Sequence, residues 1–314
     1  MIPLVIIFLS LASGYTLRRL RERGGMEDTA SSRLRHVLQM VALFGCIPLA
    51  AMLSLWGLRR PEVHLLLLPF LGLAAWGWGG GLALILARLL KLNRAATGSF
   101  FCCGAFTNIG AVGSLVCLMW LGEASIALTA LYRLCEEMFY FGVALPVARR
   151  FGTTGPAVFD RPLRSPLLYA VLCALALGIA LNMLGVQRPQ YLGTVAAALV
   201  TLSTIFFLFS IGLGLRLSRL RWYIPQSLTM CAIKFLLVPL GIVGLARIMG
   251  LQHMDDGLAM KTVAILATMP VAMNALIPPS LFRLDLDLAN ACWIYSTLAL
   301  VLVLPLLHAL LAFL

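Results

Sequence analysis

Long apolar runs follow one another along almost the whole of this 314-residue chain. A helix needs roughly 17 to 25 apolar residues to cross a hydrocarbon layer about 30 Å thick, and runs of that length recur here with only short polar gaps between them. Hydrophobic residues make up 61% of the chain and charged residues 11%, which is not the composition of a soluble domain of this length. The sequence therefore predicts an all-α polytopic membrane protein without a separate soluble domain.

Ten transmembrane helices, which we number span one to span ten, are expected from these runs. Their ranges are 2–17, 36–56, 63–87, 96–121, 124–147, 166–184, 191–215, 224–248, 258–282 and 288–313. Most Lys and Arg residues lie in the loops after the odd-numbered spans, whereas the opposite side carries Arg59, Arg60, Arg188 and Arg247. Because basic loops stay on the cytoplasmic side, both termini are predicted to lie outside. The positive charge follows the first span, which argues against a cleaved signal peptide.

The net charge of +12 follows from this loop asymmetry. We interpret it as a topology signal that also suits anionic headgroups of the lipid bilayer, and we do not expect nucleic acid as a partner. The eight cysteines lie in apolar spans without metal-ligand spacing, and the four histidines are scattered singly. We expect no metal and no cofactor. Catalytic residues and an enzymatic activity are not expected either, since no serine or cysteine has a histidine or aspartate at the spacing of a nucleophile and its base.

The chain divides into two halves of five spans each, 1–150 and 166–314, joined by a short basic cytoplasmic linker at 151–165. Because each half has an odd number of spans, the second half must be inverted relative to the first, as in secondary transporters that bind substrate near the middle of the membrane. A shift of about 164 residues lays Asn108 on Ala272, two residues from Asn274. Span count and spacing thus predict two inverted five-helix repeats.

Span nine contains residues that interrupt a helix. Its stretch "ATMPVAMNALIPPSLF" places Pro270, Pro278 and Pro279 close to Asn274 in apolar sequence. A proline removes a backbone hydrogen bond and clashes with the preceding turn. A continuous helix is therefore not expected in span nine.

Span four has a second set of helix-interrupting residues at the matching position. Its stretch "FFCCGAFTNIGAVGS" supplies Asn108, Gly110 and Gly113 in place of prolines. Irregular backbone at membrane depth is tolerated where it is buried in protein or lines a wet cavity. Two broken helices at matching positions of inverted halves therefore predict a substrate site between them.

The chemistry of this predicted site favours an anion. The second half of a broken helix begins with N–H groups of partial positive charge, which suit a carboxylate. The candidate substrate-binding residues are Asn108, Gly110, Gly113, Pro270 and Asn274. The two asparagine side chains would contact the substrate or would only satisfy the backbone that each break frees, and these roles are compatible.

Four ionisable residues inside spans are further candidates, because charge at mid-membrane is costly and usually functional. In span five, Arg133 and Glu137 are four residues apart and can pair on one helical face, with Glu136 beside them. These three form either a self-neutralised cluster or a proton relay or gate. In span eight, Lys234 has no partner on its own helix and would pair with Glu136 or Glu137, or attract the anion.

Several stretches of the chain carry a family resemblance. They are the opening "MIPLVIIFLSLASGYTLRR", "NIGAVG" in span four, "KFLLVP" in span eight, and "MPVAMNA" followed by "DLDLANACWIYSTLALVLVLP" in the last two spans. In their order and spacing, over nearly the whole chain, the sequence resembles the auxin efflux carrier family of membrane transporters. This family includes bacterial dicarboxylate permeases and the plant auxin exporters.

The resemblance implies ten transmembrane helices in two inverted five-helix repeats, with helices four and nine broken and crossing. It also implies an elevator-like movement of spans three to five and eight to ten against spans one, two, six and seven, in an arrangement that allows a homodimer. A permease of the bacterial type is expected in the inner (plasma) membrane.

The match departs from the family pattern N-x-G-F-x-G-x-P in span four. Asn108, Gly110 and Gly113 are present, but Ala111 replaces the aromatic residue and Leu115 replaces the proline. The crossing geometry of the broken helix in the first half must therefore depend on the flexibility of its glycines. The primary hypothesis is a secondary active transporter for a small organic anion, a mono- or dicarboxylate. The missing proline supports the alternative, a non-transporting membrane sensor or assembly subunit with the carrier fold.

Overall fold

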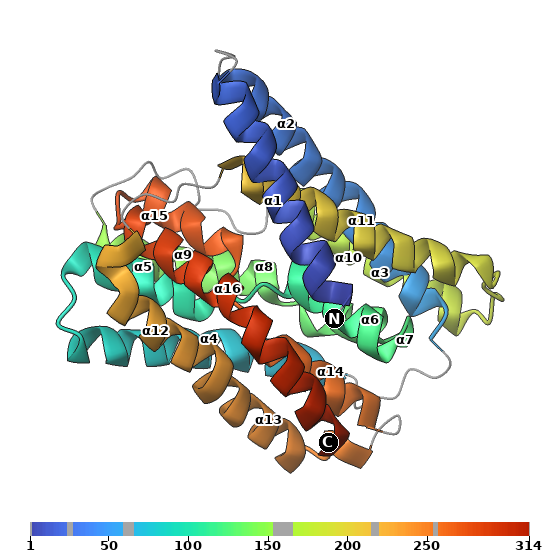
Figure 1. The fold of residues 1–314 in the computed structure, drawn as a ribbon. Helices are drawn as coiled ribbons and strands as arrows, with labels where there is room; N and C mark the ends of the chain where they lie inside the picture. The colour runs from blue at the N-terminus through green and yellow to red at the C-terminus, as the bar shows by residue number, and fades with distance from the viewer. Residues whose placement is uncertain are drawn as a thin grey trace. The chain divides into compact units, whose positions relative to one another are not determined.

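The structure is a computed structural model that describes residues 2–23, 28–58, 66–152, 166–214, 220–253 and 257–313. These residues form α-helical, 3-10 and π-helical segments, and the β-structure among them is a single isolated bridge. Figure 1 shows these helices as coiled ribbons. The prediction of an all-α protein is confirmed.

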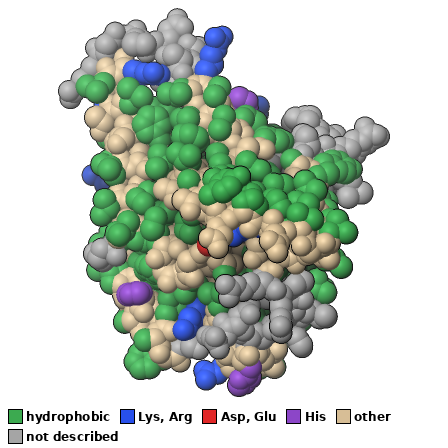
Figure 2. Space-filling model, turned by 90° about the vertical axis from the view of Figure 1, so that its right-hand side faces the viewer, with side chains coloured by type: hydrophobic (Ala, Val, Ile, Leu, Met, Phe, Trp, Pro, Cys, Tyr) green, Lys and Arg blue, Asp and Glu red, His purple; other side chains and the backbone are tan. Residues whose placement is uncertain are grey.

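Among the described residues, six helices are long and apolar enough to cross a membrane. They are Ile2–Arg21, Arg33–Trp56, Leu67–Leu89, Tyr191–Leu213, Leu220–Ile248 and Leu286–Phe313. These helices match predicted spans one, two, three, seven, eight and ten, and shorter apolar helices lie within spans four, six and nine. Figure 2 shows one face on which hydrophobic side chains predominate, as a surface in contact with lipid requires. The total of ten spans and their inverted repeat remain predictions.

The chain forms two compact units, each of which is described by itself. Unit 1 comprises Met1–Val63, Gly110–Ala130 and Ser165–Arg216, and unit 2 comprises His64–Ile109, Leu131–Arg164 and Leu217–Leu314. These units do not coincide with the two predicted sequence halves, whose division stays a prediction. Residues 153–165 of the predicted linker lie outside the described residues.

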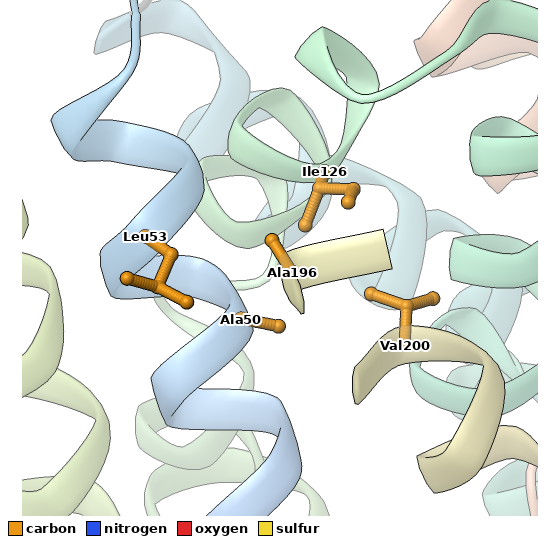
Figure 3. Packing of buried hydrophobic residues seen from close by; sticks show 5 residues of the cluster. All are labelled: Ala50, Leu53, Ile126, Ala196 and Val200. Atoms are coloured by element: carbon orange, nitrogen blue, oxygen red, sulfur yellow. The ribbon is translucent and has the colours of Figure 1, made fainter. Parts of the chain in front are cut away.

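Unit 1 is built from helices of both sequence halves. They are α1 (Ile2–Arg23), α2 (Asp28–Met40), η1 (Val41–Cys46), α3 (Ile47–Trp56), α6 (Ser114–Leu121), most of α7 (Ala124–Tyr132), α10 (Pro166–Met183) and α11 (Tyr191–Gly214). A small apolar cluster forms part of its core, with side chains from α3, α7 and α11 that point toward one another in Figure 3. Its buried members are Ala50, Leu53, Ile126, Ala196 and Val200.

Glycines allow close helix packing in unit 1. Helix α1 runs along α11, and α10 packs against α3 (Figure 1). A Cβ atom added to Gly14 would collide with the backbone carbonyl of Phe209, and one added to Gly178 would press on the carbonyl of Met52. Small residues of this kind let membrane helices approach each other at backbone distance. Span one is thus held on span seven, and span six on span two.

Unit 2 contains the remaining helices except η3 (Ile109–Gly113), most of which belongs to unit 1. They are α4 (Leu67–Leu89), α5 (Arg94–Ala105), α8 (Glu136–Phe139), η4 (Tyr140–Ala144), α9 (Leu145–Phe151), η6 (Leu220–Tyr223), α12 (Ile224–Ala232), η7 (Ile233–Leu237), α13 (Val238–Ile248), η8 (Leu251–His253), α14 (Leu258–Ala267), η10 (Met273–Leu276), α15 (Ile277–Leu281), α16 (Leu286–Leu310) and η11 (Leu311–Phe313). The carboxamide oxygen of Asn93 caps α5 and the carboxylate of Asp285 caps α16, by accepting from backbone N–H groups of the first turn. These caps define where both helices begin.

Gly14→Ala tests the close packing of α1 on α11. We expect it to lower the free energy of unfolding by about 1 to 3 kcal/mol, because the added methyl group must displace backbone atoms of α11. Thermal unfolding in detergent would measure the loss. Gly81→Ala in α4 is the matched control, because a Cβ there meets nothing within 4 Å. Equal stability of the two variants would contradict the expectation.

Candidate functional site

The predicted interruptions of spans four and nine are both present in unit 2. Helix α5 ends at Ala105, and its chain continues through Phe106 in an extended conformation with φ −93° and ψ 129°. Helix α14 ends at Ala267, and the chain becomes extended at Ala272 before η10 begins. Pro270 explains the second break, because it has no N–H to donate and disfavours helical conformation in the preceding residue.

The two breaks meet in a short antiparallel contact. Thr107 and Val271 form the isolated bridge. On one side of it the Asn108 N–H donates to the Pro270 carbonyl at 2.8 Å, and on the other the Ala272 N–H donates to the Phe106 carbonyl at 3.1 Å. Each break thus supplies hydrogen-bond partners for the main chain of the other. We call residues 106–108 and 270–272 together the crossover.

A third helix completes the hydrogen bonding of the crossover. The Val271 N–H donates to the Ser296 hydroxyl of α16 at 3.2 Å, and that hydroxyl donates to the Trp293 carbonyl at 3.1 Å. The N–H groups of Asn108, Val271 and Ala272 are therefore satisfied by the protein, as the membrane interior demands. The side chain of Asn108 is itself buried, with 7% exposure.

Lys234 on η7 reaches the crossover from span eight. Its ammonium nitrogen donates to the Gly104 carbonyl at 2.7 Å and to the Thr107 hydroxyl at 2.9 Å, and the side chain is fully buried. Within the described part of the chain, no carboxylate forms an ion pair with it. Of its two expected roles, pairing with Glu136 or Glu137 is therefore not found, and attraction of an anion stays a prediction. The last carbonyls of a helix carry partial negative charge, which explains why the ammonium lies there instead.

The charged residues of span five lie at a further interruption that the sequence reasoning missed. A turn at Arg133–Cys135 separates α7 from α8, and it disrupts the i,i+4 register on which the Arg133–Glu137 pair depended. The guanidinium of Arg133 pairs with Glu136 instead, with 2.5 Å between Nε and Oε2. The carboxylate of Glu137 is half-buried and accepts no hydrogen bond among the described residues.

Asn274 is tied to this ion pair. Its amide nitrogen lies 3.5 Å from Oε1 of Glu136, at the long limit of a hydrogen bond, while the other oxygen of Glu136 accepts from Arg133. Glu136 is 6% exposed. A buried carboxylate therefore connects the span-five turn with the start of η10, so that three of the predicted residues form one linked group in unit 2.

Gly110 and Gly113 follow Asn108 directly, in the π-helical turn η3 (Ile109–Gly113). Residues from Gly110 onward belong to unit 1, where the Thr204 hydroxyl of α11 donates to the Ala111 carbonyl at 2.8 Å and the Ser114 hydroxyl donates to the Gly110 carbonyl at 3.1 Å. The turn thus has its own anchors within unit 1. Sequence reasoning missed Thr107, Thr204 and Ser296, since single hydroxyls in apolar spans are common.

The arrangement combines two broken helices whose ends are buried with a buried amide at Asn108 and buried charge at Lys234 and Glu136. Among the residues that the structure describes, no group of three or more His, Cys, Asp or Glu side chains could hold a metal ion.

Comparison with known proteins gives one relative that covers almost the entire chain. A protein of Methanothermobacter thermautotrophicus named "Uncharacterized transporter" is 25% identical over 304 residues, which are 96% of this chain and 94% of that protein. This chain is similar to a transporter. No family model matches it, so the resemblance to the auxin efflux carriers stays a prediction. Together with the helices long enough to cross a membrane, the similarity supports an integral membrane protein and suggests a transporter.

Glu136→Gln tests the link between span five and the crossover. We expect a loss of about 1 to 3 kcal/mol in the free energy of unfolding, because the partly buried Arg133 keeps its charge and loses its carboxylate partner. Glu137→Gln, at the next position, is the control and should cost much less. Chemical unfolding in detergent would measure both, and equal losses would contradict the pairing.

Proposed function

We propose that the protein is a secondary active transporter for a small organic anion, a mono- or dicarboxylate, which binds at the crossover. The observation that carries this proposal is the bridge between Thr107 and Val271, where two interrupted helices exchange main-chain hydrogen bonds. Secondary transporters form substrate sites from such discontinuous helices. The similarity to the protein named "Uncharacterized transporter" supports the transport part of this proposal.

The fold proposed for this carrier has ten spans in two inverted five-span repeats. Two features of unit 1 and unit 2 support it. In unit 1, α1 packs on α11 and α10 packs on α3. Span one therefore contacts span seven and span six contacts span two, which are equivalent contacts when the two halves are exchanged. In unit 2, the breaks after α5 and α14 fall at positions that correspond under the alignment of the two halves.

Movement of an elevator type is part of the proposal. Spans one, two, six and seven all belong to unit 1, and spans three, eight, nine and ten belong to unit 2. This grouping resembles the division into a fixed and a moving part that alternating access requires. Residues 110–130, from spans four and five, group with unit 1, so the proposed moving part lacks them.

An anion suits the proposed site for electrostatic reasons. Peptide N–H groups at the start of the segments after each break carry partial positive charge. The Asn108 and Asn274 amides can add hydrogen-bond donors, and Lys234 contributes a positive charge in contact with Thr107 of the bridge. A carboxylate at the crossover would therefore meet donors and positive potential together.

The cellular setting is proposed on the same basis. We place the protein in the inner (plasma) membrane of a bacterium, with both termini outside, because the Lys and Arg residues gather in the loops after odd-numbered spans. Its partners would be the lipid bilayer, the organic anion and a second copy of the chain in a homodimer, without nucleic acid.

Uptake by reconstituted proteoliposomes tests the proposal. We expect saturable uptake of at least one radiolabelled mono- or dicarboxylate, measured with and without a proton gradient, and none in protein-free liposomes. Binding of a carboxylate without uptake in either orientation would favour a non-transporting sensor or assembly subunit. Absence of both binding and uptake for all acids tested would contradict the proposed function.

Asn108→Ala tests the place of binding. Loss of one hydrogen bond to a charged carboxylate costs about 1.5 to 3 kcal/mol, so the apparent Kd should rise roughly 10-fold to 100-fold. Thr16→Ala, in the first span, removes a hydroxyl that only bonds within its own helix and serves as the control. Ligand-induced thermal shifts would report the affinity, and an unchanged Kd with an intact fold would place the substrate elsewhere.

A further inference from the structure

Lys234 has an environment that is unusual for a lysine in a membrane span. Its side chain is fully buried, and the oxygen atoms that its ammonium nitrogen contacts are a backbone carbonyl, Gly104 O, and a hydroxyl, Thr107 Oγ1. Isolated buried charge is expensive. A reason for this charge must therefore lie in the groups that it touches.

The carbonyl that Lys234 contacts is one that the helix break leaves without its helical partner. In a continuous helix the N–H of Asn108 would donate to Gly104 O, but here it donates to the Pro270 carbonyl. Gly104 is the penultimate residue of α5, so its carbonyl belongs to the negative end of the helix dipole. The ammonium supplies both the missing hydrogen bond and a compensating charge.

The same set of oxygen atoms is typical of a cation site. In secondary transporters, carbonyls of unwound backbone and of half-helix C-terminal ends coordinate a coupling ion such as Na⁺. Hydroxyl and carbonyl oxygens are ligands that such hard cations accept. Here the ammonium of Lys234 lies where an inorganic cation would lie.

Close packing around the Gly104 carbonyl limits access to it. A Cβ atom added to Gly79 of α4 would collide with the Gly104 carbonyl, so backbone of α4 covers that carbonyl on one side. Lys234 enters from η7. The cationic group is thus enclosed by three segments of unit 2.

The second break has a different cap. At the C-terminal end of α14 the Thr268 hydroxyl donates to the Ala264 carbonyl at 2.7 Å, within its own helix. The position that corresponds to Lys234 in the first half is Phe70, a residue with 62% exposure. One helix end is closed by a neutral hydroxyl and the other by a charge, so the lysine is specific to the first break.

We propose that Lys234 is a resident cation that occupies the place of a coupling metal ion at the crossover, so that the protein assembles its crossover and binds its substrate without sodium or another inorganic cation. The part that concerns substrate rests on the proposed function. The part that concerns the crossover does not, because it can be measured without any substrate.

Thermal unfolding of the purified protein tests the resident cation. Wild-type protein should have the same Tm in sodium, potassium and choline chloride at equal ionic strength. Lys234→Ala should lower the Tm by roughly 5 °C or more, because it leaves the Gly104 carbonyl buried without a partner. It also opens room for a small cation, so n-propylammonium should restore part of the loss in a saturable way, and bulkier tetramethylammonium should not.

Lys261→Ala in α14 is the matched control, since Lys261 is half-buried in a span of the same unit. It should show no rescue by n-propylammonium. If Lys234→Ala gives no folded protein, Lys234→Met and Lys234→Arg replace it. A lower Tm for the uncharged methionine, with partial recovery by arginine, would support the proposal, and a methionine variant as stable as wild type would overturn it.

Cation dependence separates this inference from the proposed function. A wild-type Tm, or a carboxylate-induced shift, that rises selectively with sodium would overturn the resident cation while leaving carboxylate transport in place. Conversely, a cation-independent wild type with a rescued Lys234→Ala variant, but no carboxylate binding or uptake, would contradict the proposed function alone. Absence of n-propylammonium rescue in a folded Lys234→Ala variant would also count against the resident cation.

Discussion

Main-chain polar groups at membrane depth must find partners inside the protein, and the organisation of unit 2 depends on this requirement. Where α5 and α14 stop, the N–H of Asn108 and that of Ala272 lose their helical acceptors and use carbonyls of the opposite break. Either break alone would leave buried groups unpaired at a cost of several kcal/mol each. The two interruptions therefore depend on each other, although they lie far apart in the sequence.

Groups that the opposite break does not satisfy recruit side chains from neighbouring helices. The Val271 N–H uses Ser296 of α16, and the Gly104 carbonyl uses Lys234 of η7. Each of these hydrogen bonds fixes another span against the crossover. Hydrogen bonding of the broken backbone thus determines which helices surround the proposed site.

Sequence reasoning found the parts of this site whose cause is local. Pro270 marks the second break because it removes a helical hydrogen bond in its own segment, and the asparagines mark both segments because polar side chains are unusual in apolar spans. The partner of Lys234 could not be predicted, since it depends on the register between η7 and α5. The turn at Arg133–Cys135 contains neither glycine nor proline, so its composition does not predict an interruption of the helix there. The pairing of Arg133 with Glu136, which follows from that turn, could therefore not be predicted either.

The two breaks differ in what maintains them. The second contains Pro270 and is followed by Pro278 and Pro279, whose rings fix backbone torsions whether or not a partner is present. The first has no proline, and it keeps its extended shape through hydrogen bonds from the second break and through Lys234. A ligand that competes for those hydrogen bonds would therefore act mainly on the first break. In the proposed carrier, this makes the segment around Asn108 the part of the crossover that responds to substrate.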